Sequence, residues 1–581
     1  HIALSSDRKH ITNTKVTVAS ILCHHRKNIV FYLLHGGLQE RDCRPLAEVV
    51  ATLGINCRFI PLQLKGNAWQ GVPTSKSVPE ATCCRLSLPS LLPNLDRVIY
   101  VDSNVVVYDD IQELWDLDIG QYSCAAMKIH DYAGHLEPLR GYDGFNAGVM
   151  CFNLAMMRKN HAEKRFQEAG EKFKDKLLFC CEDILNLVFR DECLALPRRW
   201  NVTSGIYQRT GSYASIPEEE ALEILRAPSA VHFTTERKPW HLGEKTVDHP
   251  HSFLYSSYAA LADCPLWFRF KMFLKYPWHG KLEASEWARK YGDSLLVPPA
   301  RPLTPEELRQ AQLLELKILH EIQRVCRKND IQFFLIGGTL LGAFRHNGFI
   351  PWDDDLDVAM LREDYDRFLE IAPNELGEEF WINHLEKDLT YGHLFAKVML
   401  KNTKWSSGGV QNIMARQGIY VDIFPFDRIA SQPKDQKKHY RQAKKYRRLL
   451  RLKTKYPVKR KSLFPAIRQY FTWVYASLLK LPEIHRRVHR LFDDGHRQAD
   501  ANNPICTAVG ANYCGSARPE EWFRDLVPHR FEDGEFPVPR SSEDILKYQY
   551  GDYMKLPPED KRRAHGINDF CFGPYGDSPH A

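Results

Sequence analysis

Short apolar runs alternate with longer amphipathic runs at the start of the chain. The runs 2–7, 29–34 and 57–61 have the length of buried strands, whereas 11–23 and 43–53 have the length of helices. Strands that alternate with helices are typical of βαβ units, whose strands form a parallel sheet. We therefore predict an α/β domain with ligands bound at the carboxyl ends of its strands.

A second pattern begins at Thr304, where the sequence carries the start signals of a helix. Thr304 is a good N-cap, Pro305 fits the first turn, and Glu307 completes a capping box. Apolar side chains then recur at helical spacing and predict one buried face: Leu308, Ala311, Leu314, Ile318, Ile322 and Val325. The helix leads to an apolar run that predicts a strand before Gly337.

The chain is too long for a single core. Single hydrophobic cores stop growing at about 250–300 residues, and this chain has 581. The proline-rich stretch 297–302 predicts a hinge between domains. We predict a domain at 1–255, an aromatic and basic segment with a linker at 256–302, and a second domain at 303–581.

Two aspartates in the second domain form the most demanding motif. Asp355 and Asp357 alternate with Leu356 and Val358, so a strand here would place both carboxylates on one face. Carboxylates this close repel each other unless a divalent cation lies between them, and Mg²⁺ accepts carboxylate and phosphate oxygens. An acidic solvated turn is the alternative interpretation, but it does not explain the apolar residues on both sides.

The residues before these aspartates suit a phosphate group. Gly337 and Gly338 let the backbone approach a ligand closely and direct N–H groups at it. The hydroxyl of Thr339 follows directly. Together with the paired carboxylates, this pattern indicates phosphoryl or nucleotidyl transfer.

Four segments of the second domain resemble the LicD family: 337–343, 345–346, 350–357 and 420–425. That family belongs to the nucleotidyltransferase-fold phosphotransferases and includes bacterial phosphorylcholine transferases and the fukutin-related proteins. The resemblance extends over 303–565. It implies an α+β nucleotidyltransferase fold, Mg²⁺, and a donor linked to cytidine diphosphate.

The same resemblance implies further site residues. Asp422 would complete metal binding or accept the acceptor's proton, and Lys397 would contact phosphate, although a solvent-facing strand lysine is the alternative. Arg345 lies within a matching segment. If the donor is CDP-choline, its quaternary ammonium group prefers an aromatic face, for which Trp352 is a candidate together with Tyr391 and Phe395. Polyol phosphates are the alternative substituents.

In the first domain, an apolar strand at 97–101 delivers Asp102 and then Asn104, whose oxygens can bind a cation on a diphosphate. A helix or turn cap is the alternative. With Arg85, Asn146, Asp183 and His232, these residues resemble glycosyltransferase family 8, the retaining, metal-dependent enzymes that use UDP-sugars on a type-A nucleotide-sugar fold. The similarity covers about 1–250.

That resemblance implies a role for each residue of the set. The nucleoside would lie at Asp7 and His10, and Lys238 would contact the diphosphate. The donor sugar would be surrounded by Arg85, Asn146, Glu182 and Asp183, and the carboxylates of Glu182 and Asp183 would be the catalytic residues. The ligands of Mn²⁺ or Mg²⁺ would be Asp102, Asn104 and His232.

Two departures from the family pattern change the expected chemistry. Asn104 replaces a carboxylate of the usual Asp-x-Asp, which should weaken metal binding because ligand charge helps to hold a hard cation. Cys181-Glu182-Asp183 stands in place of Asp-Gln-Asp, so a carboxylate moves to Glu182. An inactive sugar-binding module is the alternative to an active enzyme.

Charge is concentrated in one segment. The net charge is +7, but 434–461 alone holds fourteen Lys or Arg against one acidic residue. An aromatic stretch at 463–481 follows, and 266–278 also mixes aromatic and basic residues. These patterns suit an anionic membrane surface or a lipid-linked glycan, although a solvated face and inter-domain packing are alternatives. Nothing nearby resembles a nucleic-acid module, so we predict no nucleic-acid partner.

The fifteen cysteines are scattered and show no C-x-x-C spacing, which suits a reducing compartment. We therefore predict a cytoplasmic protein, with peripheral contact to the inner membrane face as an option. Our functional prediction is a bifunctional enzyme that adds a sugar from a nucleotide-sugar and a phospho-substituent from a CDP-linked donor to a glycan or lipid-linked glycan. The competing prediction is a membrane-docked, glycan-binding scaffold.

Overall fold

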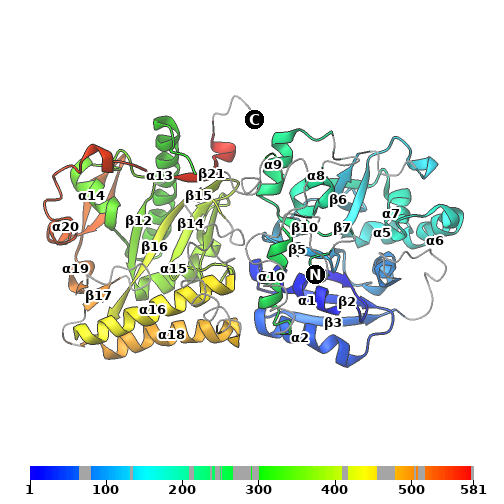
Figure 1. The fold of residues 1–581 in the computed structure, drawn as a ribbon, viewed down its shortest axis with the longest axis horizontal. Coiled ribbons are helices and arrows are strands. Elements are labelled where there is room, and N and C mark those ends of the chain that lie inside the picture. The colour runs from blue at the N-terminus through cyan, green and yellow to red at the C-terminus, as the bar shows by residue number, and fades with distance from the viewer. Residues whose placement is uncertain are drawn as a thin grey trace. The chain divides into compact units, whose positions relative to one another are not determined.

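The chain forms two compact units, His1–Val297 and Pro298–Ala581 (Figure 1). The structure is a computed structural model, and it describes the following residues: 1–64, 80–130, 135–208, 213, 215–235, 238–241, 249, 251–265, 290, 300–407, 417–454, 475, 478–500, 502, 505–507, 517–564 and 566–576. The segment predicted at 266–278 lies outside this range, as do residues 455–474, which belong to the predicted basic and aromatic stretches at 434–461 and 463–481, and residues 297–299 of the hinge at 297–302.

The first unit is built on a seven-stranded sheet with the order β3-β2-β1-β4-β7-β6-β8. The predicted parallel sheet is confirmed for the strands at its start, because β1 pairs in parallel with β2 and β4, and β2 with β3. β7 is antiparallel to both of its neighbours. The strands are β1 (Ile2–Ser5), β2 (Val30–His35), β3 (Arg58–Gln63), β4 (Arg97–Val101), β6 (Cys124–Ile129), β7 (Gly144–Asn153) and β8 (Cys193–Leu196).

A small second sheet, with the order β5-β10-β9, carries one of the predicted site residues at the end of β10. Its strands are β5 (Val105–Val107), β9 (Val202–Thr203) and β10 (Ala230–His232). The α-helices of the unit are α1 (Ile11–His24), α2 (Glu40–Leu53), α3 (Leu88–Leu91), α4 (Gln112–Trp115), α5 (Leu154–Lys159), α6 (Ala162–Phe173), α7 (Cys181–Phe189), α8 (Ser204–Gln208), α9 (Glu218–Arg226) and α10 (Ser252–Leu261), and the 3₁₀ helix η1 spans Glu80–Ser87.

The start of α2 differs from the sequence prediction. The helix begins at Glu40 rather than at residue 43, because Gln39 and Asp42 form a reciprocal capping box ahead of the apolar residues. The apolar periodicity used for the prediction begins only with Cys43, so it could not reveal this polar first turn.

The second unit contains a mixed sheet with the order β11-β12-β16-β14-β13, so it has the predicted α+β character. β12 and β16 are parallel, whereas β14 runs antiparallel to β16 and β13. The strands are β11 (Phe334–Leu335), β12 (Asp357–Leu361), β13 (Phe380–Asn383), β14 (Ala396–Leu400), β15 (Lys404–Ser407), β16 (Tyr420–Ile429), β17 (Ile505–Thr507), β18 (Arg518–Pro519), β19 (Leu526–Phe531), β20 (Gly534–Pro539) and β21 (Ile567–Cys571).

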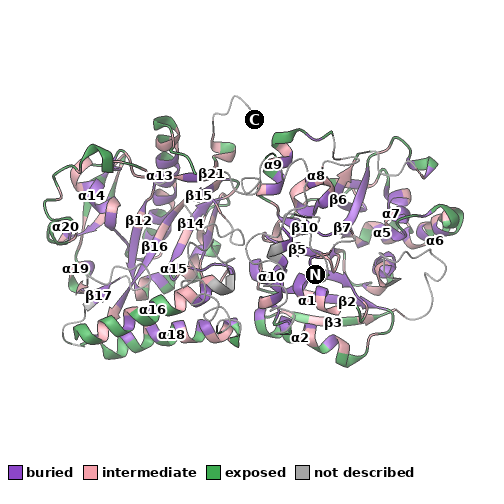
Figure 2. Ribbon diagram, in the orientation of Figure 1, coloured by how far each residue is buried: buried purple, intermediate pink, exposed green. Residues whose placement is uncertain are grey.

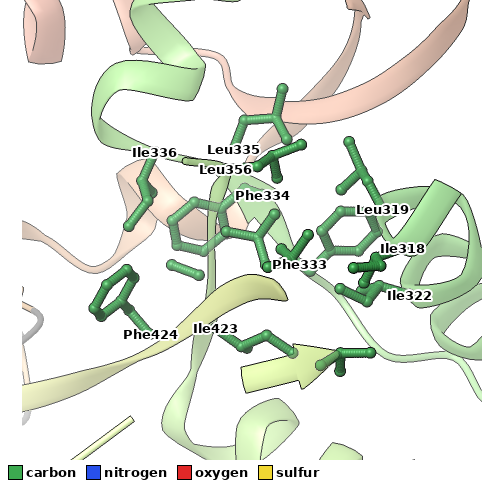
Figure 3. Close-up of a cluster of buried hydrophobic side chains, with 14 of the residues drawn as sticks. Ile318, Leu319, Ile322, Phe333, Phe334, Leu335, Ile336, Leu356, Ile423 and Phe424 are labelled. Atoms are coloured by element: carbon green, nitrogen blue, oxygen red, sulfur yellow. The ribbon is translucent and has the colours of Figure 1, made fainter. Parts of the chain in front are cut away.

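Helix α13 (Pro305–Lys328) confirms the predicted helix start, because Thr304 and Glu307 form the capping box. Its apolar face packs on the sheet. Figure 3 shows Ile318, Leu319 and Ile322 against side chains from the region of β11, β12 and β16, including Phe333, Leu356 and Ile423. Full burial of such a side chain contributes about 1.5–3 kcal/mol, so this face anchors the helix beneath the strands that carry the aspartates.

The remaining helices cover the sheet and its edges. They are α14 (Gly337–His346), α15 (Arg362–Glu375), α16 (Pro433–Thr454), α18 (Leu481–Gln498), α19 (Glu521–Arg524) and α20 (Ser542–Tyr550). α16 and α18 lie side by side, and α18 contacts β16 (Figure 1). Across the described part of both units, no helix is both long enough and apolar enough to cross a membrane.

Candidate active sites

The sheet of the second unit aligns three of the predicted residues in one row. Asp357 on β12 is in register with Asp422 on β16, and Asp422 is in register with Lys397 on β14. Residues that face each other across neighbouring strands project from the same side of a sheet. Asp355 lies two residues before Asp357, and Leu356 between them is fully buried, which agrees with the predicted alternation.

Lys397 and Asp422 form a close ion pair, with the Lys397 Nζ 2.5 Å from the Asp422 Oδ1. The ammonium group also lies 3.2 Å from the centre of the Tyr420 ring. Lys397 is therefore not the solvent-facing strand lysine of the alternative interpretation. Because Lys397 contacts a carboxylate of the cluster, its direct contact with phosphate stays a prediction.

The carboxylates of this row are buried, where the ionised form of the group is unfavourable. Burial, followed by the charges of Asp355 and Asp422, raises the pKa of Asp357 well above its usual value. Burial also raises the pKa of Asp422, and the charge of Lys397 opposes that shift. One lysine offsets only part of this negative charge, and binding of a further cation at the cluster stays a prediction.

The glycine pair begins helix α14 rather than forming an open loop. Gly337 has φ of +59°, a backbone conformation that favours glycine. A Cβ at Gly338 would lie 2.8 Å from the Asp353 Oδ2, so this carboxylate lies directly over the glycine. The Thr339 Oγ1 accepts a hydrogen bond of 2.8 Å from the backbone N–H of Asp357. These contacts hold α14 against the start of β12.

Basic and aromatic side chains from separate parts of the chain surround this cluster of carboxylates. The Arg345 Nη1 donates to the Tyr553 carbonyl at 3.1 Å, and the Arg562 guanidinium lies 5.5 Å from the centre of the half-buried Trp352 ring. Partial burial, followed by the charge of Asp357, raises the pKa of Tyr550 to about 12. Sequence reasoning assigned no site role to Tyr550 or Arg562.

Glu315 was also missed. This carboxyl group on α13 is 2% exposed, and within the described residues its Oε2 has no hydrogen-bond partner. Burial, followed by the charges of Asp355 and Asp354, raises its pKa well above the usual value. No signal in the sequence distinguished Glu315 from the other helical glutamates of α13.

The other aromatic candidates for the choline group, Tyr391 and Phe395, are 3% and 9% exposed and so belong to the core.

In the first unit, Asp102 follows β4 as predicted and meets Arg85. The Arg85 Nη2 donates to the Asp102 Oδ1 at 2.7 Å, and the Tyr100 hydroxyl donates to the same oxygen at 2.9 Å. Arg85 is buried and lies over the Tyr100 ring. Burial raises the pKa of Asp102, and the Arg85 charge opposes this shift. The second carboxylate oxygen of Asp102, Oδ2, faces His232.

His232 is oriented by two amide oxygens. Its Nδ1 lies 3.0 Å from both the Asn146 Oδ1 and the Asn201 Oδ1, and its Nε2 lies 3.9 Å from the Asp102 Oδ2. Burial, followed by the charges of Lys238 and Arg85, lowers the pKa of His232 to about 3. The neutral ring then donates through Nδ1–H and presents the Nε2 lone pair to Asp102, which is the tautomer that a metal ligand needs.

Asn104 is tied to the same segment. Its Nδ2 donates to the Phe233 carbonyl at 3.1 Å, and the Phe233 N–H donates to the Asn104 carbonyl at 3.1 Å. The Lys238 Nζ donates to the Phe233 carbonyl as well. With Nδ2 used in this way, the Asn104 Oδ1 is the atom that remains to bind a cation.

The two carboxylates at the start of α7 have different surroundings. The Glu182 Oε2 accepts from the backbone N–H of Ala147 at 2.8 Å and from the Asn146 Nδ2 at 3.2 Å. The Asp183 side chain is fully buried, and its Oδ2 accepts from the N–H groups of Leu178 and Phe179, both at 2.8 Å. With these contacts Asp183 holds the turn before α7. Its role as a catalytic residue stays an untested prediction.

Asp7 and His10 form a separate pair at the end of β1. The Asp7 Oδ1 accepts from the His10 backbone N–H at 2.9 Å and lies 2.8 Å from the His10 Nδ1. Both side chains are partly exposed, so their polar atoms remain accessible for a nucleoside. Sequence reasoning missed Asn201 and Tyr100. Both contact predicted residues, but Asn201 is remote from them in the sequence and Tyr100 lies within an apolar run.

The fold and these two polar clusters are those expected of a transferase with two enzyme domains, and the family comparisons support that class. The sequence pattern described as glycosyl transferase family 8 matches residues 1–243, and the pattern described as LicD/FKTN/FKRP, nucleotidyltransferase domain, matches residues 330–476. Both predicted resemblances are thereby confirmed.

Individual proteins show the same two similarities. The lipopolysaccharide cholinephosphotransferase LicD of Haemophilus influenzae is 31% identical over 275 residues, which cover 45% of this chain and 97% of that protein. The general stress protein A of Bacillus subtilis is 27% identical over 268 residues, covering 44% of this chain and 93% of that protein. The galactosyltransferase LgtC, solved with donor and acceptor sugar analogues, is 25% identical with a TM-score of 0.41, covering 46% of this chain and 99% of LgtC.

The chain belongs to the LicD family, and the glycosyl transferase family 8 pattern covers residues 1–243, ahead of the LicD domain.

We predict that Gly148→Ala disturbs His232. A Cβ at Gly148 would lie 2.2 Å from the His232 Cε1, so the ring must move away from Asn146. Such overpacking typically costs about 1–3 kcal/mol, and we expect a lower unfolding temperature of the first unit in calorimetry. Gly36→Ala is the control, because nothing lies within 4 Å of a Cβ there. Equal unfolding temperatures for both variants would show that the contact is not restrictive.

Proposed function

We propose that the first unit transfers a hexose from a UDP-sugar and that the second unit transfers phosphorylcholine from CDP-choline to a sugar hydroxyl of a glycan. The in-register row of Asp357, Asp422 and Lys397 carries this proposal, because it gathers carboxylates at one point of the LicD domain. The similarity to a lipopolysaccharide cholinephosphotransferase supports the choice of substituent.

The donor set of the second unit suits Mg²⁺, since carboxylate oxygens are the ligands that this cation prefers. Asp355 and Asp357 would hold it, and the bound cation would offset the charge on the donor phosphates. Asp422 would accept the proton of the attacking hydroxyl, and its ion pair with Lys397 favours the ionised form that can do so. Catalysis of this kind depends mostly on positioning and charge neutralisation.

The phosphate group of the donor would contact the start of α14, and its choline group would contact an aromatic residue that follows this helix. Gly337, Gly338 and Thr339 lie at its N-terminus, where helix N–H groups and the helix dipole favour an anion. For choline, Trp352 is the better aromatic candidate, because it is half-buried whereas Tyr391 and Phe395 are buried. Choline would have to share this ring with the Arg562 guanidinium, which lies 5.5 Å from its centre.

In the first unit, Asp102, Asn104 and His232 would hold Mn²⁺ or Mg²⁺, which would offset the charge of the UDP leaving group. The oxygen and neutral imidazole donors fit such a cation, and the fixed Nδ1–H of His232 supports its role. Lys238 would add positive charge at the diphosphate. Asp7 and His10 would bind the nucleoside, and Arg85, Asn146, Glu182 and Asp183 would shape the sugar site.

A glycan-binding scaffold with an inactive first unit is the second candidate. The amide at Asn104 favours it, because one anionic ligand is missing. The ordered contacts of Asp102 with Arg85 and of His232 with Asn146 favour an intact site. Sugar transfer by the purified chain decides between the two candidates.

The exposed face of α16 would bring the enzyme to an anionic membrane carrying its acceptor. This face presents Lys434, Lys437, Lys438, Arg441, Lys444 and Lys445 (Figure 2). Six cations with a single acidic residue, Asp435, among them attract anionic lipids, each by about 1 kcal/mol. The location would then be the cytoplasmic face of the membrane.

We predict that the chain transfers label from CDP-choline to a glycan acceptor in preference to CDP-glycerol and CDP-ribitol. Asp355→Asn should reduce this transfer at least about 100-fold, because it removes charge from the cation site at nearly constant volume. Scintillation counting of the purified glycan measures it. The control Asp500→Asn changes an exposed aspartate at the end of α18 and should retain full activity.

Preferential transfer from a polyol donor would overturn the choline assignment but not the phosphotransferase. Near-normal transfer by Asp355→Asn would overturn the cation site itself.

For the first unit, we predict that Asn104→Asp tightens binding of Mn²⁺ in the presence of UDP by about tenfold, because it restores an anionic ligand. The Phe233 carbonyl loses the Asn104 donor but keeps the Lys238 ammonium, so the segment should remain folded. Isothermal titration calorimetry measures the change. Equal or weaker affinity means that Asn104 is not a ligand.

We also predict that the triple variant Lys437→Glu, Lys438→Glu, Lys444→Glu weakens binding to phosphatidylglycerol vesicles by about 100-fold or more, since each lost cation contributes about 1 kcal/mol. Co-sedimentation at low salt measures binding. The matched control Lys172→Glu, Lys174→Glu, Lys176→Glu makes the same charge change on exposed lysines of the first unit. If both triples lose affinity equally, net charge rather than α16 governs binding.

A further inference from the structure

Three cysteines of the first unit bring their thiols together behind the donor site. Cys83 belongs to η1, whereas Cys180 and Cys181 lie at the start of α7. Their sulfur atoms all lie within 4.8 Å of one another, and the Cys83 Sγ is 2.9 Å from the Cys180 Sγ. Each residue is 1% exposed. Sequence reasoning read the cysteines as scattered, because 97 residues separate Cys83 from Cys180.

The backbone at Cys180 adopts an unusual conformation to make this cluster. Its φ is +53° and its ψ is −121°, which is outside the left-handed helical region that Asn or Asp tolerate. A non-glycine residue held in such a region costs about 1–3 kcal/mol and often marks a functional constraint. At Cys180 the strained residue turns its thiol toward Cys83 directly before α7 begins.

A buried cation acts on the cluster. Cys180 accepts hydrogen bonds from the thiols of Cys181 and Cys83, which lowers the pKa of Cys180 and raises the pKa of the two donors. The charge of the buried Arg85 guanidinium acts on both Cys180 and Cys181 in the same direction. The Arg85 charge therefore favours the negative charge that bound thiolates would bring.

We propose that Cys83, Cys180 and Cys181 bind one thiophilic divalent metal ion of the Zn²⁺ class. Soft thiolates select such ions. On binding, the three thiols release their protons to solvent, and three thiolates with one divalent ion carry a charge of −1 beside Arg85. Zinc–sulfur bonds of about 2.3 Å require sulfur atoms about 4 Å apart, so the Cys83 and Cys180 thiols would separate by about 1 Å.

Such an ion would act as a structural clamp on the donor site. Cys83 precedes Arg85 by two residues, and Arg85 holds Asp102 and the Ala147 carbonyl. Cys181 precedes Glu182, which accepts from the Ala147 N–H. The ion would therefore join η1 to α7, the two elements that carry these site residues. It is separate from the cation proposed at Asp102, whose ligands are oxygen and nitrogen.

The test uses the full chain in a background that removes metal-binding thiols at the surface. Cys57→Ser and Cys571→Ser replace the two described cysteines that are not buried. The reduced, chelator-treated protein is titrated anaerobically with Cd²⁺, while thiolate-to-metal charge-transfer absorption is followed. Bound Zn²⁺ is counted separately by elemental analysis.

We expect one tightly bound ion per chain and a loss of affinity of about 100-fold or more in Cys83→Ser or Cys180→Ser. Cys151→Ser is the matched control, because it changes another buried cysteine of the same unit, and it should bind as the background does. In the unsubstituted chain, Zn²⁺ should slow hydrogen exchange at 181–185, which tests the clamp even if a variant fails to fold.

Three results would overturn the proposal. The first is the absence of a stoichiometric site in the background protein, and the second is unchanged affinity after Cys83→Ser and Cys180→Ser. The third is a Cys83–Cys180 disulfide in freshly isolated protein that, after reduction, still binds no metal. Each can be observed without measuring sugar transfer.

Discussion

Each unit depends on one carboxylate that is held against a cation at the edge of its core. Asp102 pairs with the buried Arg85, and Asp422 pairs with Lys397. A buried carboxylate without a partner would cost several kcal/mol or take up a proton. With the partner present, the carboxylate can stay ionised while apolar side chains pack around it, so the same ion pair serves both the core and the site.

The ion pairs also explain why the surrounding elements are positioned so closely. Arg85 fills a place between β4 and the start of β7, where it contacts both Asp102 and the Ala147 carbonyl. Lys397 joins β14 to β16 and covers the Tyr420 ring. Because each cation contacts more than one element, a shift of either strand would break several interactions at once. This coupling suits sites that must be rigid before a substrate arrives.

The sequence was sufficient to predict the features that depend on residues close together in the chain. The capping box at Thr304, the buried face of α13 and the strands around Asp102 and Asp357 follow from spacing alone. The polar first turn of α2 and the helical start at Gly337 were not predicted, because a capping pair and a positive φ leave no apolar pattern. The contacts of Lys397 with Asp422, and the presence of Glu315 and Tyr550 near the aspartates, depend on strand register and on segments far apart in the chain. No local pattern contains that information.

The contact between Gly148 and His232 limits how these two positions can change over evolutionary time. The imidazole occupies the space that a side chain at position 148 would need, so the two residues share one volume. A related protein that replaced the histidine by a smaller residue would free that space and could then acquire a side chain on β7. Paired replacement at these two positions in other sequences would therefore identify members that have lost this histidine, whereas a glycine kept with the histidine would identify those that retain the arrangement.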